Sequence, residues 1–242
     1  MKALITAILL VLAFNLSFAQ SELKDYFPVS IIKPDLSAER EQEILRQAKL
    51  LEKENLTGAE KTELDSLLKK YGEFTESVWN IRDGDCSWYC GGGSYKVKSS
   101  SGLSSQNPTE FKAKSADDNS YKTAWVEGKE DEGKGEYLEF FFKNESPRIT
   151  SIIVCNGYMK SETAWKNNNR VKKLKLFINN KAAGVLNLED SRSNQEFKVG
   201  TLGRNPDKKD LVLKFEILEV YKGEKYNDTA ITEIYFDGID VH

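Results

Sequence analysis

The stretch Ala-Asp-Asp-Asn-Ser-Tyr-Lys-Thr-Ala-Trp at residues 116–125 is the part of this chain that decides its fold. It is a polar turn that runs into Thr-x-Trp, and its Asp, Asn and Ser side chains favour tight turns. A second stretch, Ala-Ile-Thr-Glu-Ile-Tyr-Phe-Asp-Gly at residues 230–238, reads as a strand and carries one acidic residue before Asp237, namely Glu233. The turn and the closing strand together favour a β-rich domain.

Short apolar segments separated by Gly, Asn, Asp and Ser continue this pattern from about Trp79 onward. Asn179 and Asn180 form a hairpin-turn pair between two of the segments. Strands at this spacing, with no helical segment between them, predict an antiparallel β-sandwich or jelly roll. The expected strands are 137–142, 148–155, 171–178, 183–188, 211–218 and 231–236.

The first 19 residues have the pattern of an export signal. Lys2 precedes an apolar run at 3–14, and the small residues Ser17 and Ala19 suit the positions before a cleavage site. A membrane anchor is the alternative, but the run is short for a transmembrane span. No Cys lies near the cleavage site to carry a lipid. We therefore expect a secreted or periplasmic protein with no transmembrane segment in its mature chain.

The residues before the β-rich part divide into a linker and a helical hairpin. Residues 20–35 contain Pro28 and Pro34 without periodicity, which indicates a linker. Residues 36–72 predict two helices, the first capped by Ser37 and the second opened by the capping box at 57–60. We interpret this hairpin as a spacer or docking pair on the sandwich at 80–242, and the alternative is a dedicated partner-binding helix.

Composition argues against several function classes. The formal net charge is −3, whereas a general nucleic-acid binder should be more basic. The single histidine is the last residue, His242, so mechanisms that pair Ser or Cys with His lack a base. There is no phosphate-binding Gly-rich motif. Carboxylates are numerous enough for a glycosidase-type acid pair, yet nothing in the sequence pairs two of them, so we predict that the protein is not an enzyme.

Three cysteines follow the leader. Cys86 and Cys90 are spaced closely enough to close a small disulfide loop in an exported protein. A zinc site would need further Cys or His ligands. Cys155 lies in an apolar strand, which favours a buried free thiol, and pairing with a thiol on another chain is the alternative.

Five ordered motifs in the β-rich part resemble one known family. They are Cys86–Gly92, Lys122–Gly128, Asn156–Tyr158, Trp165–Val171 and Leu211–His242. Together they are similar to the NADase-type glycan-binding domain, a discoidin-like (galactose-binding-like) family, over about residues 80–242. The resemblance implies a mainly β, jelly-roll β-sandwich preceded here by a short α-helical hairpin. The chain is too short to hold a glycohydrolase domain as well, so NAD hydrolysis is not implied.

The resemblance also implies a structural calcium ion where the polar turn meets the last strand. Asp118 takes the first acidic position of the family motif, Ser120 replaces its second Asp or Asn, and Thr123 and Glu233 match. Calcium takes oxygen ligands from carboxylates, hydroxyls and carbonyls, which these residues offer. Asp117 is an alternative ligand by adjacency. The other interpretation is an ordinary polar turn in which carboxylates accept backbone N–H bonds.

Two long polar loops, 156–170 and 219–229, hold the candidate ligand residues. Aromatic rings stack on the apolar face of a sugar, while amide, carboxylate and guanidinium groups bond its hydroxyl groups. The expected function is non-catalytic carbohydrate binding, with a glycan or glycoconjugate as partner. The alternative is a protein-interaction or adhesion module that docks the same loops on a cell-surface protein. The candidate residues are Tyr158, Trp165, Asn168, Arg170, Tyr221 and Asp228.

Overall fold

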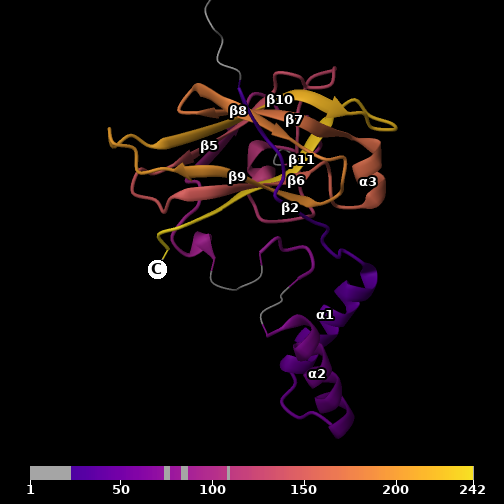
Figure 1. The fold of residues 1–242 in the computed structure, drawn as a ribbon. Coiled ribbons are helices and arrows are strands. Elements are labelled where there is room, and N and C mark those ends of the chain that lie inside the picture. Colours follow the sequence, from indigo (N-terminus) through magenta and orange to yellow (C-terminus); the bar gives the residue numbers. More distant parts are fainter. Residues whose placement is uncertain (1–22, 74–76, 83–86, 108–109, 242) are drawn as a thin grey trace, which may run out of the picture.

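The protein folds as two facing β-layers with a helical hairpin beside them (Figure 1). This computed structural model describes residues 23–73, 77–82, 87–107 and 110–241, so the expected export signal lies outside the described part. One layer contains β2 (Ser30–Ile32), β9 (Asn194–Leu202), β6 (Ile149–Asn156), β11 (Thr229–Gly238) and β4 (Trp125–Val126). The other contains β1 (Lys24–Tyr26), β8 (Lys181–Asn187), β7 (Asn169–Ile178), β10 (Leu211–Tyr221), β5 (Tyr137–Phe142) and β3 (Lys96–Ser99).

The two layers join at one corner and face each other elsewhere. β11 pairs in parallel with the start of β7 at Ala230 and Arg170, whereas β7 pairs antiparallel with β8 and β10 along most of its length. Aromatic rings meet between the layers: Phe140 on β5 lies 5.2 Å from Phe236 on β11, measured between ring centroids. The expected discoidin-like jelly-roll β-sandwich is confirmed.

Alternation along the strands builds the core. In β5 every second residue is buried, including Phe140 and Phe142, and the same pattern runs along β10. Side chains of adjacent strand residues point to opposite faces, so this alternation aims one face of each layer inward. Trp125 is fully buried in this core, and its Nε1–H donates to the Ser101 carbonyl at 2.8 Å. Trp88 is buried where its ring packs against Phe142.

The segment expected as a linker forms two short strands instead. β1 pairs in parallel with β8, and β2 pairs antiparallel with β9, so residues 24–32 cross between the open edges of the two layers. We call residues 24–32 the strap. Tyr26 packs against the main core, whereas Phe27, Val29 and Ile32 are exposed. Both strands are too short to show a period in the sequence, and their partners lie far along the chain.

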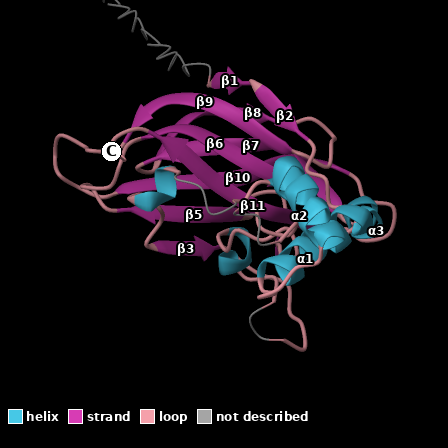
Figure 2. Cartoon of the chain, turned by 90° about the horizontal axis from the view of Figure 1, so that it is seen from below, coloured by secondary structure: helices cyan, strands magenta, loops and turns pink. Residues whose placement is uncertain are grey.

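The expected hairpin is present as α1 (Ala38–Leu51) and α2 (Gly58–Tyr71). Ser37 caps α1, and Thr57 and Glu60 form the predicted capping box at the start of α2. Leu50, Leu64 and Leu67 pack between the helices, which lie below the sandwich on the side of α3 (Glu162–Asn167; Figure 2). Among the helices of the described residues, none has the length and apolar character needed to cross a bilayer.

Candidate functional site

A cavity of about 450 Å³ opens at the end of the sandwich where α3 lies. It forms where the loop after β6, α3, the loop before β11 and a segment near residue 111 come together. The rings of Phe111, Tyr158 and Tyr226 give it an apolar wall, and the polar groups come from α3 and the loop residues beside it. Its lining is Leu103, Phe111, Val126, Tyr158, Ser161, Thr163, Ala164, Asn167, Asn168, Tyr226 and Asp228. We call this space the neutral cavity.

Tyr158 lines the neutral cavity from the loop that follows β6. Its ring meets Phe111 edge to face, with centroids 6.1 Å apart and planes at 88°, a favourable aromatic geometry. Its hydroxyl donates to the Lys122 carbonyl at 3.4 Å, and burial raises the pKa of Tyr158. Gly157 before it has φ +79°, and an added Cβ would lie 2.6 Å from Arg170 Cγ, so only glycine fits this turn.

Asn168 and Asp228 are the other predicted ligand residues that line the cavity. Asn168 ends α3, and its Nδ2 donates to the Ala164 carbonyl at 2.8 Å, which fixes the side chain. Asp228 is half-buried at the start of β11, and its backbone carbonyl accepts the Asn169 N–H at 2.9 Å. The Asn169 side-chain oxygen accepts the Gly223 N–H at 2.7 Å, so the two loops are bound together beneath the cavity.

Trp165, Arg170 and Tyr221 do not line the cavity and are bonded within the protein. The Arg170 guanidinium donates to both oxygens of Asp190 at 3.0 and 2.9 Å and to two backbone carbonyls. It also stacks on the Trp165 ring, whose Nε1–H donates to the Asn156 carbonyl. Tyr221 donates to the Leu188 carbonyl at 3.0 Å. The structure places these three residues as supports of the loops rather than as cavity walls.

Sequence reasoning did not select Phe111 or Tyr226 as ligand residues. Tyr226 is 43% exposed on the 219–229 loop, and Phe111 adopts φ +61°, a left-handed conformation that is uncommon for an aromatic residue. Tyr226 lies on the 219–229 loop, which the sequence already marked as a candidate ligand loop, so an aromatic residue there could have been chosen from the sequence. Phe111 reaches the cavity only through tertiary folding, because it is distant in sequence from both loops.

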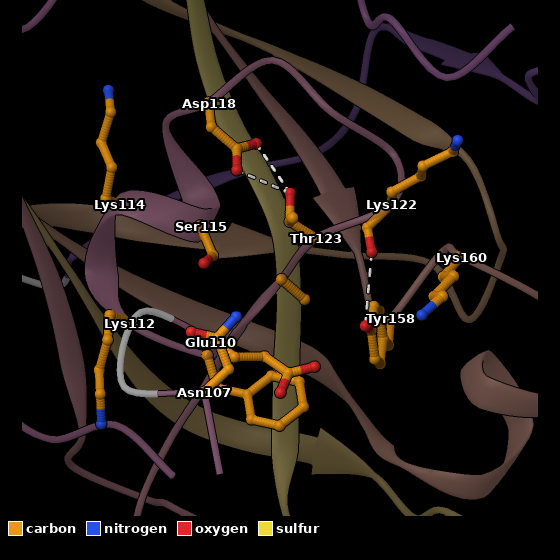
Figure 3. Close-up of a pocket in the computed structure, with 12 residues that line it drawn as sticks. Asn107, Glu110, Lys112, Lys114, Ser115, Asp118, Lys122, Thr123, Tyr158 and Lys160 are labelled. Atoms are coloured by element: carbon orange, nitrogen blue, oxygen red, sulfur yellow. Dashed lines mark hydrogen bonds between the residues drawn. The ribbon is translucent and has the colours of Figure 1, made fainter. Parts of the chain in front are cut away.

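The polar turn meets the last strand as expected. The buried Glu233 carboxylate accepts the backbone N–H groups of Asp118 and Asn119 at 3.2 and 3.0 Å. The Thr123 hydroxyl lies 2.8 Å from each Asp118 oxygen (Figure 3). The Ser120 side chain instead accepts the Lys122 N–H within the turn. Desolvation, together with the neighbouring Asp118 charge, raises the pKa of Glu233 well above its usual range, and desolvation also raises that of Asp118.

These oxygen atoms are of the kind that calcium takes, and both carboxylates also accept hydrogen bonds from the turn itself. Glu233 is buried whereas Asp118 is exposed, and among the described residues no basic side chain forms a salt bridge with Glu233. A bound calcium ion would offset the charge of the buried Glu233, with Asp118, Thr123 and Glu233 as oxygen donors. Ser120 would contribute its carbonyl, because its hydroxyl is committed to the turn. Within the described part of the chain, no cluster of three or more His, Cys, Asp or Glu side chains has metal-binding geometry, so a calcium site here would depend on hydroxyl and carbonyl oxygens.

The structure describes two of the three cysteines, Cys90 and Cys155. Cys86 lies outside the described residues, so the Cys86–Cys90 disulfide stays a prediction. The Cys90 Sγ accepts the Ser87 N–H at 3.4 Å in a short 3₁₀ turn, Trp88–Cys90. Cys155 is fully buried, as predicted, and its thiol donates to Asn194 Oδ1 at 3.1 Å. Burial raises the pKa of Cys155, which makes it unreactive at neutral pH.

Comparison with known families identifies the sandwich. Residues 88–237 match the NAD glycohydrolase translocation F5/8 type C domain family. The chain belongs to this family. The match agrees with the resemblance expected for about residues 80–242. The strap and the hairpin lie outside the matched F5/8 type C region, although β1 and β2 extend its sheets. No curated protein matches the chain.

Solved structures are similar to this family member only at low sequence identity and with TM-scores below 0.5. The CBM32-1 and CBM32-2 domains of Clostridium perfringens ZmpB are 16% identical, with a TM-score of 0.44 over 61% of this chain and 35% of that chain. CpGH89CBM32-5 from Clostridium perfringens, in complex with GalNAc-β-1,3-galactose, is 18% identical, with a TM-score of 0.41 over 59% of this chain and 94% of that chain. The chain thus spans about a third of the first structure.

Proposed function

We propose that this protein is a secreted or periplasmic, non-catalytic glycan-binding module whose neutral cavity holds a sugar ring. The observation that carries this proposal is the composition of the cavity wall. Tyr158, Phe111 and Tyr226 offer apolar ring surface, while Asn168 and Asp228 offer an amide and a carboxylate at the same opening. Sugars need both kinds of contact, because each ring has apolar C–H faces and a rim of hydroxyl groups.

Rigid support favours binding by this site. Asn168 is fixed by α3, and the buried Arg170 bonds the Asn168 and Lys222 carbonyls, so the loops on both sides of the cavity share one anchor. A site held in place before binding loses less conformational entropy when the ligand arrives. A calcium ion at Asp118, Thr123 and Glu233 would add to this rigidity, because the polar turn runs directly into the strand beneath the cavity.

A glycan array probed with the mature protein, in calcium, tests the proposal. The informative variants are Tyr158→Ala, which removes the central ring, and Asp228→Asn, which keeps the shape and removes the charge. We expect both to lose about 10-fold or more in affinity for any glycan that the native protein binds, since a stacked ring and a charged hydrogen bond each contribute about 1–3 kcal/mol.

Tyr221→Phe is the matched control, because Tyr221 lies on a neighbouring loop but bonds the Leu188 carbonyl instead of lining the cavity. It should bind glycans like the native chain. A folded native protein that binds no glycan on the array would overturn the proposal and favour the protein-interaction alternative. Native binding that survives Tyr158→Ala would place the sugar elsewhere on the molecule.

A further inference from the structure

A second cavity of about 580 Å³ adjoins the neutral cavity and shares Phe111 and Tyr158 with it. Its remaining walls come from the polar turn and from the chain before it, including Ser115, Asp118 and Thr123 (Figure 3). Phe111 and Tyr158 therefore form part of the wall of both cavities. A ligand that packs on the Tyr158 ring would lie beside both cavities.

Four lysines surround this second cavity, which we call the basic cavity: Lys112, Lys114, Lys122 and Lys160. In Figure 3 the Lys160 ammonium points toward Tyr158, while the other three side chains extend outward at the rim. Only two acidic residues, Glu110 and Asp118, share the lining. The lining therefore holds four lysines and two acidic residues, although the whole chain has a formal net charge of −3.

Most of this positive charge is not neutralised by ion pairs. Lys114 pairs with Asp117 at 3.0 Å. Lys112 donates to the Gly102 and Leu103 carbonyls, and Lys122 lies over the Trp79 ring, so neither of these contacts cancels a charge. Among the described residues, Lys160 forms no salt bridge with a carboxylate. Three of the lining lysines, Lys112, Lys122 and Lys160, therefore keep an uncancelled positive charge, and the Lys160 ammonium is the one that points toward the Tyr158 ring (Figure 3).

We propose that the glycan bound by this protein is acidic, with a carboxylate or sulfate group that occupies the basic cavity while a neutral ring packs in the neutral cavity. This inference rests on the proposed function. Ammonium groups bind sugar carboxylates and sulfates through charge-assisted hydrogen bonds, which are stronger than neutral ones. Because the lysines are largely exposed, each contributes modestly and the contribution is screened by salt.

The test is an array on which neutral oligosaccharides are printed beside their uronic acid, sialylated and O-sulfated counterparts. We expect the acidic forms to bind about 5-fold or more tightly than the matched neutral forms at about 0.05 M NaCl, and the advantage to shrink below about 2-fold at 0.5 M. Carboxylated and sulfated counterparts distinguish the two anion types, since each differs from the same neutral glycan by one group.

Lys122→Gln combined with Lys160→Gln should bring the ratio of acidic to neutral affinity close to one. Lys181→Gln is the control, with the same loss of charge at an exposed position beyond the far end of β7, roughly 30 Å from the cavities along that strand. Thermal unfolding of each variant checks the fold.

The outcomes separate the two proposals. Binding of neutral and acidic glycans with equal affinity, or an acidic preference that survives the double substitution in a folded protein, overturns this inference and leaves glycan binding intact. An array without any bound glycan overturns the proposed function and this inference together. A preference confined to sulfated or to carboxylated forms supports the inference and identifies the anion.

Discussion

Arg170 shows how a residue that suits a ligand can instead hold a site together. Its guanidinium uses its bidentate face on Asp190 and its remaining donor on two backbone carbonyls, and its plane covers Trp165. The side chain is only 9% exposed. These contacts connect the α3 loop, the 219–229 loop and the β8–β9 connection. Arg170 therefore does not line the neutral cavity but holds in place the loops that do.

Removal of this support should destabilise the protein. We expect Arg170→Met to lower the free energy of unfolding by about 2–3 kcal/mol, because buried carbonyl groups lose their donor and Asp190 loses its partner. Urea denaturation followed by tryptophan fluorescence measures the change. The control is Arg204→Met, since Arg204 is half-exposed and lies 3.4 Å from Asp240, which predicts a change within about 0.5 kcal/mol. Equal stability of the two variants would contradict the structural role of Arg170.

Residue types on a loop did not reveal which side chains face outward. Of the predicted ligand residues, Tyr158, Asn168 and Asp228 line the neutral cavity, whereas Trp165 and Arg170 pack against each other. Sequence identifies the chemistry that a loop carries. The short helix α3 sets the direction of each side chain in this loop. The sequence did not predict this helix, because residues 156–170 are mostly polar and show no helical periodicity.

At the scale of elements, the strap is the feature that sequence could least predict. β1 and β2 each have three residues, and their partners β8 and β9 lie more than 150 residues further along the chain. β9 itself was not predicted, because its inward face includes the polar Gln195 beside Phe197. The longer strands with uninterrupted alternation, such as β5 and β10, were predicted correctly.

Gly184 on β8 gives a direct test of strap docking. An added Cβ there would lie 2.5 Å from both the Lys24 carbonyl oxygen and the Tyr26 ring. Gly184→Ala should therefore displace β1 and lower the melting temperature by roughly 5–10 °C, equivalent to about 2–3 kcal/mol. In a chain without residues 24–29 the same substitution should cost nothing. A cost that is equal in both backgrounds would show that β1 does not pack on β8.

The helical hairpin should respond to acid. A hydrogen bond from Lys53, with further bonds from Thr57, lowers the pKa of Glu60 from 4.5 to about 2. A carboxyl group with a depressed pKa stabilises the folded state above its ordinary pKa, and that contribution is lost as pH falls from 4.5 toward 2. NMR titration of the Glu60 carboxyl in the full chain should give a midpoint near 2. A midpoint near 4.5 would contradict the capping geometry, and Glu60→Gln should abolish the titration.

At the scale of the whole molecule, the proposed calcium ion would connect the polar turn to the closing strand. A ligand that binds only the folded state stabilises it by mass action, by about 2.7 kcal/mol at a concentration of 100 times its Kd. Saturating calcium should therefore raise the melting temperature by roughly 5–10 °C over a chelated sample. Glu233→Gln should remove this shift, and magnesium should not replace calcium, because magnesium requires a smaller octahedral site. An unchanged melting curve in chelator would argue against the ion.

The strap changes how the hairpin is attached to the rest of the protein. The chain pairs with both layers through β1 and β2, leaves them for α1 and α2, and returns at Asn80, which bridges to Ser120. The hairpin is therefore an excursion within one fold, not a domain at its end. Proteolytic nicking after Lys53, in the exposed loop between the helices, should thus leave two fragments that elute as one particle in gel filtration and separate only under denaturing conditions.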